Sequence, residues 1–136
     1  MKNPVVKSFR ELEVYKLHRE AAQFIFQRSR VFPRDEKYSL TDQIRRASRA
    51  VGAMVAEAWG RRRFKAVFVN KVDEALGEAN EVRAWLDSAL DCDYITAKEH
   101  ADLDARYVSI GAMLSRMIDT ADSFCHFAPS KDYRAQ

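Results

Sequence analysis

The sequence is poor in the residues that make tight turns and covalent cross-links. It contains 4 glycines, 3 prolines and 2 cysteines among 136 residues. So few turn residues disfavour a fold built of many short strands. The two cysteines, Cys92 and Cys125, are too few and too far apart to provide a disulfide framework or a thiolate metal site. We expect both to be reduced thiols buried in the core.

Long hydrophobic runs are missing as well. Charged residues interrupt each apolar stretch before it reaches the roughly 20 residues that span a bilayer. The first nine residues, MKNPVVKSF, lack the apolar centre of a signal peptide. The sequence therefore predicts a cytoplasmic protein with no membrane partner.

Apolar residues make up 47% of the chain and charged residues 32%, a balance that favours long helices. At this length one domain can bury a real core without metal or disulfide support. We expect a single domain over residues 1–127. Residues 128–136 are polar and lack periodicity, which predicts a frayed tail.

Apolar residues recur with helical periodicity in four segments. The four segments run from about Leu12 to Arg30, from Ser39 to Gly60, from Phe64 to Leu90, and from Thr96 to Cys125. We expect Ser39 to be the N-cap of the second segment and Gly60 to end it in a left-handed conformation. Thr96 and Glu99 are expected to form a capping box at the start of the fourth segment. The stripe of the first segment consists of Val14, Leu17, Ala21, Phe24 and Ile25. Four such segments with short connections predict an all-α fold, an antiparallel up-down-up-down four-helix bundle.

Four residues of the expected helices are not explained by the apolar stripes. Phe26 lies opposite the stripe of the first segment, which favours a contact with another subunit. Gly52, Gly77 and Gly111 lie inside the expected helices, where each costs about 1 kcal/mol relative to alanine. A close approach between helix backbones would offset that cost, and the alternative is that these are tolerated surface positions.

Positive charge is concentrated between Gln43 and Lys65. This segment contains seven cations and a single acid, Glu57, so its net charge is +6. The whole chain carries +3, and the rest of the chain therefore carries −3. Such segregation favours a polyanion or an acidic partner surface. The cations are Arg45, Arg46, Arg49, Arg61, Arg62, Arg63 and Lys65.

These seven residues are the candidate nucleic-acid-binding site. The first three point away from the apolar stripe, and the other four lie about 20 Å further along the helix. Guanidinium groups suit phosphate because they donate two parallel hydrogen bonds and stay charged. Trp59 and Phe64 flank the second group and are candidates for stacking on unpaired bases. The alternatives are that Trp59 packs on a neighbouring helix or subunit, and that the arginines are solvated or pair with carboxylates of the third segment.

No catalytic or metal-binding pattern accompanies the basic segment. The Glu-x-x-His pairs of di-iron bundles are absent, and His18, His100 and His126 occur singly. The sequence has neither a glycine-rich phosphate loop nor a G-x-S-x-G elbow. Nothing in the spacing of Tyr38, Ser39 and Asp42 assigns them catalytic roles. We expect a protein that is not an enzyme and that uses no cofactor or metal.

Several short motifs occur in a recognisable order along the chain. They are Phe32-Pro33, Glu36, Leu40, Gln43, Arg45-Arg46-Ala47, Ala56-Glu57, Gly60-Arg61, Gly77, Glu81 and Asp93-Tyr94-Ile95. Together they resemble the motifs of one bacterial family, the proteins encoded in intervening sequences of 23S rRNA genes, whose relatives include the accessory variability determinant of diversity-generating retroelements. The resemblance spans roughly Phe9 to Phe124, although Met54 and Ala58 replace an asparagine and a glycine that are usual in the family.

The resemblance implies a homopentameric ring of four-helix bundles with a basic surface that holds RNA. Arg45, Arg46 and Arg61 match arginines of the family motif, whereas the other cations enter from charge alone. We therefore expect a cytoplasmic homo-oligomer that binds structured RNA. The rival interpretation is a protein-interaction scaffold whose arginines pair with acids of a neighbour, such as Glu74 and Glu78.

Overall fold

The structure, a computed structural model, describes residues 5–126 and is helical. The four long helices are α1 (Glu13–Ser29), α2 (Asp42–Gly60), α3 (Lys65–Asp91) and α4 (Ala97–Asp119), and the shorter elements are α5 (Ala121–Phe124), η1 (Phe9–Glu11), η2 (Arg34–Glu36) and η3 (Lys37–Thr41). Within residues 5–126 there is no strand, so the predicted fold class is confirmed. The predicted tail, 128–136, lies outside the described residues.

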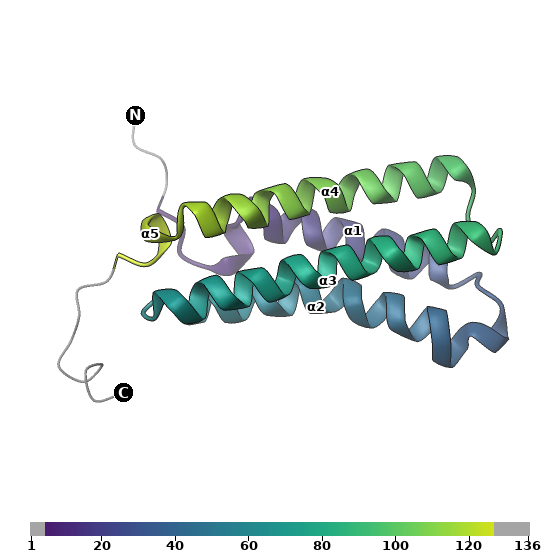
Figure 1. Cartoon of the computed structure of the whole chain (residues 1–136), viewed down its shortest axis with the longest axis horizontal. Helices are drawn as coiled ribbons and strands as arrows, with labels where there is room; N and C mark the ends of the chain where they lie inside the picture. Colours follow the sequence, from purple (N-terminus) through teal and green to yellow (C-terminus); the bar gives the residue numbers. More distant parts are fainter. Residues whose placement is uncertain (1–4, 127–136) are drawn as a thin grey trace.

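The four long helices run side by side and form a bundle (Figure 1). Helix α1 packs on α2, α2 on α3, α3 on α4, and α4 returns to α1. Because short connections join successive helices, each runs antiparallel to the one before it. The bundle places the two ends of α2 at opposite ends of the molecule (Figure 1).

The core is formed by the apolar stripes of all four helices. In α1, Val14, Ala21 and Ile25 are buried as predicted and Leu17 is half-buried, so Phe24 is the exception. Phe24 is 42% exposed, with the guanidinium of Arg106 4.4 Å from its ring centre. His18 and Ser29 are buried instead. The reason is geometric: Phe24 lies 100° around the helix from the buried Ile25 and falls outside the narrow stripe.

Of the predicted helix ends, one is confirmed, one is wrong, and one is right in position but not in conformation. Thr96 and Glu99 form the predicted capping box at α4. Ser39 does not cap α2, because it lies within the π-helical turn η3 and its hydroxyl donates to Glu36 Oε1 at 2.7 Å. Gly60 is the last residue of α2, but no described glycine has a positive φ. That conformation occurs instead at Asp93, with φ 61°, after the end of α3.

The last predicted helix is interrupted, and the predicted burial of the cysteines is wrong, although both are free thiols. Helix α4 ends at Asp119, and the hydroxyl of Thr120 donates to the carbonyl of Arg116 at 2.7 Å before α5 begins. A threonine side chain bonded in this way competes with the backbone for helical hydrogen bonds. Cys92 is exposed just beyond α3, and Cys125 is only half-buried beyond α5.

The glycines inside the helices occupy different environments. A Cβ at Gly52 would overlap the imidazole ring of His18, so this glycine lets α1 place a side chain against α2. The close approach is therefore between a side chain and a backbone, rather than between two backbones. A Cβ at Gly77 would meet no atom within 4 Å, which makes it a tolerated surface position.

We predict that Gly52→Ala and Gly77→Ala change stability in opposite directions. Gly52→Ala forces the buried His18 ring to move and should lower the free energy of unfolding by about 2 kcal/mol. Gly77→Ala should raise it by about 0.5–1 kcal/mol, because alanine has the higher helix propensity. Urea denaturation at pH 7 measures both, and equal effects at the two positions would contradict the packing described for His18.

Candidate nucleic-acid interface

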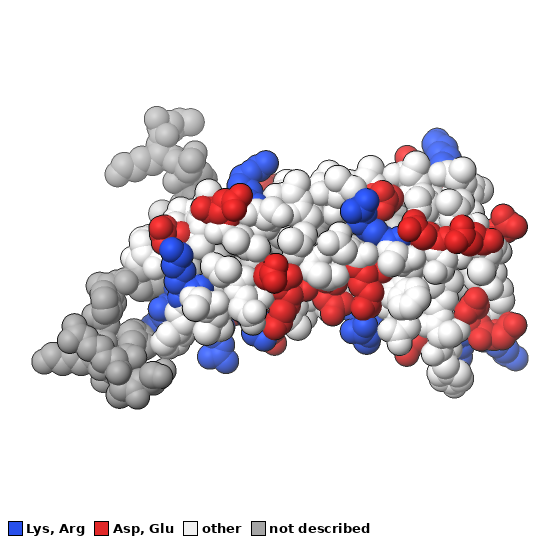
Figure 2. Space-filling view, viewed as in Figure 1, with Lys and Arg blue, Asp and Glu red and all other residues white. Residues whose placement is uncertain are grey.

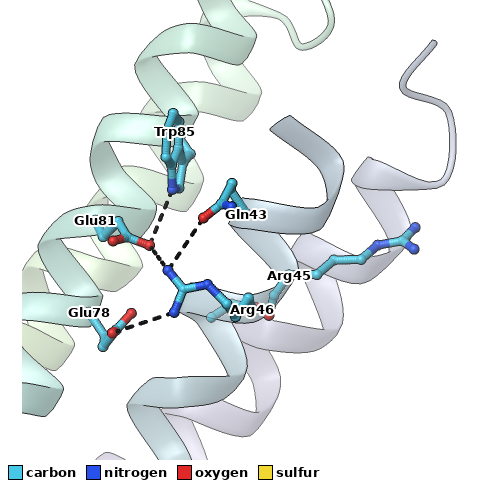
Figure 3. Close-up of polar contacts among 7 residues, drawn as sticks. Gln43, Arg45, Arg46, Glu78, Glu81 and Trp85 are labelled. Atoms are coloured by element: carbon cyan, nitrogen blue, oxygen red, sulfur yellow. Dashed lines mark hydrogen bonds and ion pairs between the residues drawn. The ribbon is translucent and has the colours of Figure 1, made fainter. Parts of the chain in front are cut away.

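Helix α2 sends its first arginines to two different sides of the bundle. Figure 3 shows Arg46 reaching toward α3, whereas Arg45 extends the other way, toward α1. Arg49 lies one turn beyond Arg45, on the same side of the helix as Arg45. Arg45 and Arg46 therefore make contacts with different helices.

Arg46 is held by carboxylates of the same chain. One guanidinium nitrogen, Nη2, donates to Glu81 Oε2 at 2.7 Å and lies 3.4 Å from Gln43 Oε1, and Nη1 lies 3.8 Å from Glu78 Oε1. The indole of Trp85 donates to the same Glu81 oxygen at 3.3 Å. Arg46 thus links α2 to α3, as in the alternative in which an arginine pairs with the acidic helix within one subunit.

Arg45 has contacts that leave its charge unneutralised. Its Nε donates to Ser29 Oγ at 2.7 Å, and its guanidinium carbon lies 4.9 Å from the ring centre of Phe26. A hydroxyl and an aromatic ring orient the guanidinium without cancelling its charge. The remaining donors of Arg45 are available to an anion.

Arg49 borders two hollows of the surface. The first, which we call the basic hollow, has a volume of about 490 Å³ and is lined by Lys37, Tyr38, Thr41, Asp42, Arg45, Arg46 and Arg49. Asp42 is its sole carboxylate. Arg49 is exposed and forms no ion pair with any residue in the range 5–126. The charge of this hollow is therefore positive even though Arg46 is neutralised.

The second hollow, the α1–α2 groove, has a volume of about 1000 Å³. Its cations are Arg10, Lys16, Arg19 and Arg49, and its carboxylate is that of Glu20. Glu20 is already paired, since its Oε1 accepts a hydrogen bond from Arg106 at 3.0 Å. Because Arg49 lines both hollows, the basic surface continues across α1 and α2.

The predicted second group of cations, at the far end of α2, is largely used within the fold. Lys65 pairs with Asp122 of α5 at 2.7 Å, a contact that raises the pKa of Lys65. The Nε of Arg62 donates to the carbonyl of Trp59 at 2.8 Å, and burial lowers the pKa of this guanidinium. Arg61 and Arg63 are exposed at the same turn.

The predicted stacking residues do not present open rings. The Arg62 guanidinium covers the Trp59 ring, 3.5 Å from its centre, and Trp59 packs against the core. Phe64 is half-buried. The packing alternative stated for Trp59 is therefore confirmed, and its partner is a helix of its own chain. The most exposed aromatic ring of the described chain belongs to Tyr38, at 83%.

Burial governs the charge state of His18 at the base of the α1–α2 groove. The side chain is 7% exposed, and its Nδ1 has no hydrogen-bond partner among the described residues. Burial, with a smaller contribution from the neighbouring charge of Arg19, lowers the pKa of His18 to about 4. The imidazole is neutral at physiological pH and adds no charge to the groove.

Carboxylates gather on the opposite part of the bundle. Figure 2 shows them along α3 and α4, on the face turned toward the viewer. Some are paired there, as Asp104 is with Arg83 at 2.8 Å. The segregation seen along the sequence is thus also a segregation in space, with a basic α1–α2 side and an acidic α3–α4 side.

Sequence reasoning missed the cations that η1, α1 and η3 add to this surface. These are Arg10, Lys16, Arg19 and Lys37, which line the two hollows with Arg49. A signal existed for Arg19 only: it lies within 20° of Phe26 on a helical wheel, so the off-stripe phenylalanine marks its side of α1. Phe26 is half-buried there, between the guanidinium groups of Arg30 and Arg45.

Two kinds of site are not found in the part of the chain that the structure describes. Residues 5–126 hold no group of three or more side chains suited to a metal ion. In the same range no helix is long and apolar enough to cross a bilayer.

An all-α bundle with one basic side is the class that the fold and this surface define. The family model of the 23S rRNA-intervening sequence proteins matches residues 10–116, so the chain belongs to that family. The chain is also similar to a solved structure from Bacteroides thetaiotaomicron VPI-5482, a protein of unknown function from the S23 ribosomal protein family. The two share 29% identity and a TM-score of 0.71, over 79% of this chain and 96% of the other. Among curated proteins, none matches.

We predict that Arg46 and Arg49 contribute unequally to stability. Arg46→Ala removes the link between α2 and two carboxylates of α3, and should lower the free energy of unfolding by about 0.5–1 kcal/mol. Arg49→Ala removes no ion pair with a described residue and should change it by less than about 0.5 kcal/mol. Thermal denaturation at low and high salt distinguishes them, and a larger loss for Arg49→Ala would contradict the geometry.

We also predict that His18 makes the protein less stable in acid. Between pH 6.5, the ordinary pKa of histidine, and about 4, the unfolded chain binds a proton that the folded chain does not. Stability should fall as the pH drops through this window, by about 3 kcal/mol from this group. The difference between wild type and His18→Gln isolates that loss from the titration of the carboxylates. A pH-independent difference would contradict it.

Proposed function

We propose that this protein binds structured RNA through the basic side formed by α1, α2 and η3, and that it does so as a cytoplasmic homo-oligomer without catalysis. The observation that carries the proposal is the position of Arg49, which is exposed, forms no ion pair with a described residue, and lines both basic hollows. Lys37 and Arg45 lie with it around the basic hollow, and neither is paired with a described carboxylate.

Phosphate is the ligand chemistry that suits this surface. Guanidinium groups stay charged at all relevant pH and donate paired hydrogen bonds to phosphate oxygens. Cations spread over two neighbouring hollows match a chain of phosphates better than one small anion. Binding of this kind recognises backbone shape and charge more than base sequence, and it weakens steeply with salt.

Self-association is the second part of the proposal. The family resemblance implies a pentameric ring, and rings are closed by head-to-tail contacts between two different faces of each copy. If the basic side binds RNA, those contacts use faces other than the basic hollow and the α1–α2 groove.

The charge separation of the bundle supports a second candidate function, a protein-interaction scaffold in which the basic side of one copy meets carboxylates of a partner. Arg46 is not the residue for that contact, because Glu81 and Glu78 of its own chain hold it. Arg49 distinguishes the two functions. A scaffold loses its assembly when Arg49 is reversed in charge, whereas an RNA-binding protein loses RNA and keeps its mass.

We predict that Arg49→Glu weakens RNA binding about tenfold at 100 mM salt and lowers the salt slope of the affinity by about one. The matched control is Lys98→Glu, which makes the same charge change in the first turn of α4, away from both hollows, and should change affinity less than twofold. Filter binding of a labelled RNA hairpin across a salt series measures both, with light scattering for mass. Wild-type affinity that is undetectable at low salt, or independent of salt, would overturn the proposal.

A further inference from the structure

Tyr38 stands beside the basic hollow as an exposed aromatic platform. We propose that an unpaired nucleotide of the bound RNA stacks its base on Tyr38 while the flanking phosphates lie on Arg45 and Arg49. This inference rests on the proposed RNA-binding function and adds what the protein recognises: a single-stranded or flipped-out nucleotide next to a structured region.

The exposure of Tyr38 is the first observation. The side chain is 83% exposed and lines the basic hollow together with Lys37, whose Nζ lies 5.2 Å from the ring centre. An open aromatic ring beside several cations is the combination with which proteins hold single-stranded nucleic acid, because every base has a face that stacks and every linkage carries a charge.

Glu36 stabilises the turn that carries Tyr38 through hydrogen bonds of its side chain. Its carboxylate accepts a hydrogen bond from the Ser39 hydroxyl at 2.7 Å and another from the Tyr94 hydroxyl at 2.8 Å. These bonds lower the pKa of Glu36, and the bond to Glu36 raises the pKa of Tyr94 to about 12. Phe32 packs against the Tyr94 ring at 5.5 Å. The backbone next to Tyr38 is therefore tied to the α3–α4 connection while its ring remains in solvent.

The polar groups of the hollow fit the sugar-phosphate part of a nucleotide. Arg45 is oriented by Ser29, Arg49 is unpaired within the described residues, and both face the same hollow as Tyr38. Thr41, a residue only 8% exposed, also lines this hollow, and its buried hydroxyl has no hydrogen-bond partner among residues 5–126. The volume of about 490 Å³ falls within the range of small-molecule sites.

An unpaired nucleotide fits these observations better than a fully paired duplex. A duplex presents phosphates but no accessible base face, so it would use the cations and leave Tyr38 without a function. The alternative is that a second copy of this chain covers the Tyr38 ring. The experiment distinguishes this alternative from nucleotide stacking.

The test compares two labelled RNAs with the same number of phosphates, one a blunt duplex and the other a shorter duplex with a four-nucleotide overhang. Fluorescence anisotropy measures the affinity of wild type, Tyr38→Ala and Tyr38→Phe for each. Tyr38→Ala should weaken binding of the overhang RNA about tenfold and of the duplex less than twofold. Tyr38→Phe keeps the ring and should stay within twofold of wild type for both. Val108→Ala, which trims an exposed apolar residue of α4, is the control.

A fluorescent 2-aminopurine in the overhang reports the stacking directly, because a base that stacks on an aromatic ring is quenched. Wild type and Tyr38→Phe should quench it, and Tyr38→Ala should not. The inference is overturned if Tyr38→Ala binds both RNAs as wild type does, if it weakens both equally, or if it lowers the oligomer mass in light scattering. Wild type that binds neither RNA would overturn the proposed function and this inference with it.

Discussion

Helix α2 buries one apolar stripe between α1 and α3, and this burial decides where its arginines lie. Ile44, Ala47 and Val51 are fully enclosed, and no cation can share their face without a large desolvation cost. Successive residues of a helix are 100° apart, so Arg45 and Arg46 leave this stripe on opposite flanks. One flank meets the carboxylates of α3, and the other meets the hydroxyl and aromatic groups of α1. The same constraint therefore produces an interhelical ion pair and an available cation from neighbouring residues.

The fold could be predicted from the sequence because the strongest signal in the sequence, apolar periodicity, also marks the residues whose burial stabilises the fold. The four helical segments and the Thr96 capping box were predicted correctly. The misplaced features depend on tertiary contacts that periodicity does not contain. Phe24 is held outside the core while His18 takes the place against Gly52, and Ser39 is drawn away from capping by Glu36. A polar residue in the core and a π-helical turn give no periodic signal.

The candidate site was only partly accessible. Charge counting identified the right helix, and Arg45 and Arg49 remain in the surface that the structure presents. Counting charges gives no information about which cations form ion pairs. It therefore grouped Arg46 and Lys65 with the available arginines, although the carboxylates of Glu81 and Asp122 pair with these two residues. The contributions of Lys16, Arg19 and Lys37 required the packing of α1 and η3 beside α2. Tyr38 carried no signal at all, since its exposure follows from the geometry of one turn.

The position of Cys92 has a practical consequence. Its thiol is exposed beyond the end of α3, two residues before Tyr94, which is bonded to the turn that carries Tyr38. Burial raises the pKa of the other thiol, Cys125, and so keeps it in the less nucleophilic protonated form. A maleimide dye at neutral pH would consequently attach first at Cys92. The natural sequence thus carries its own attachment point for a fluorophore or spin label, on the connection that Tyr94 bonds to Glu36, without engineered cysteines.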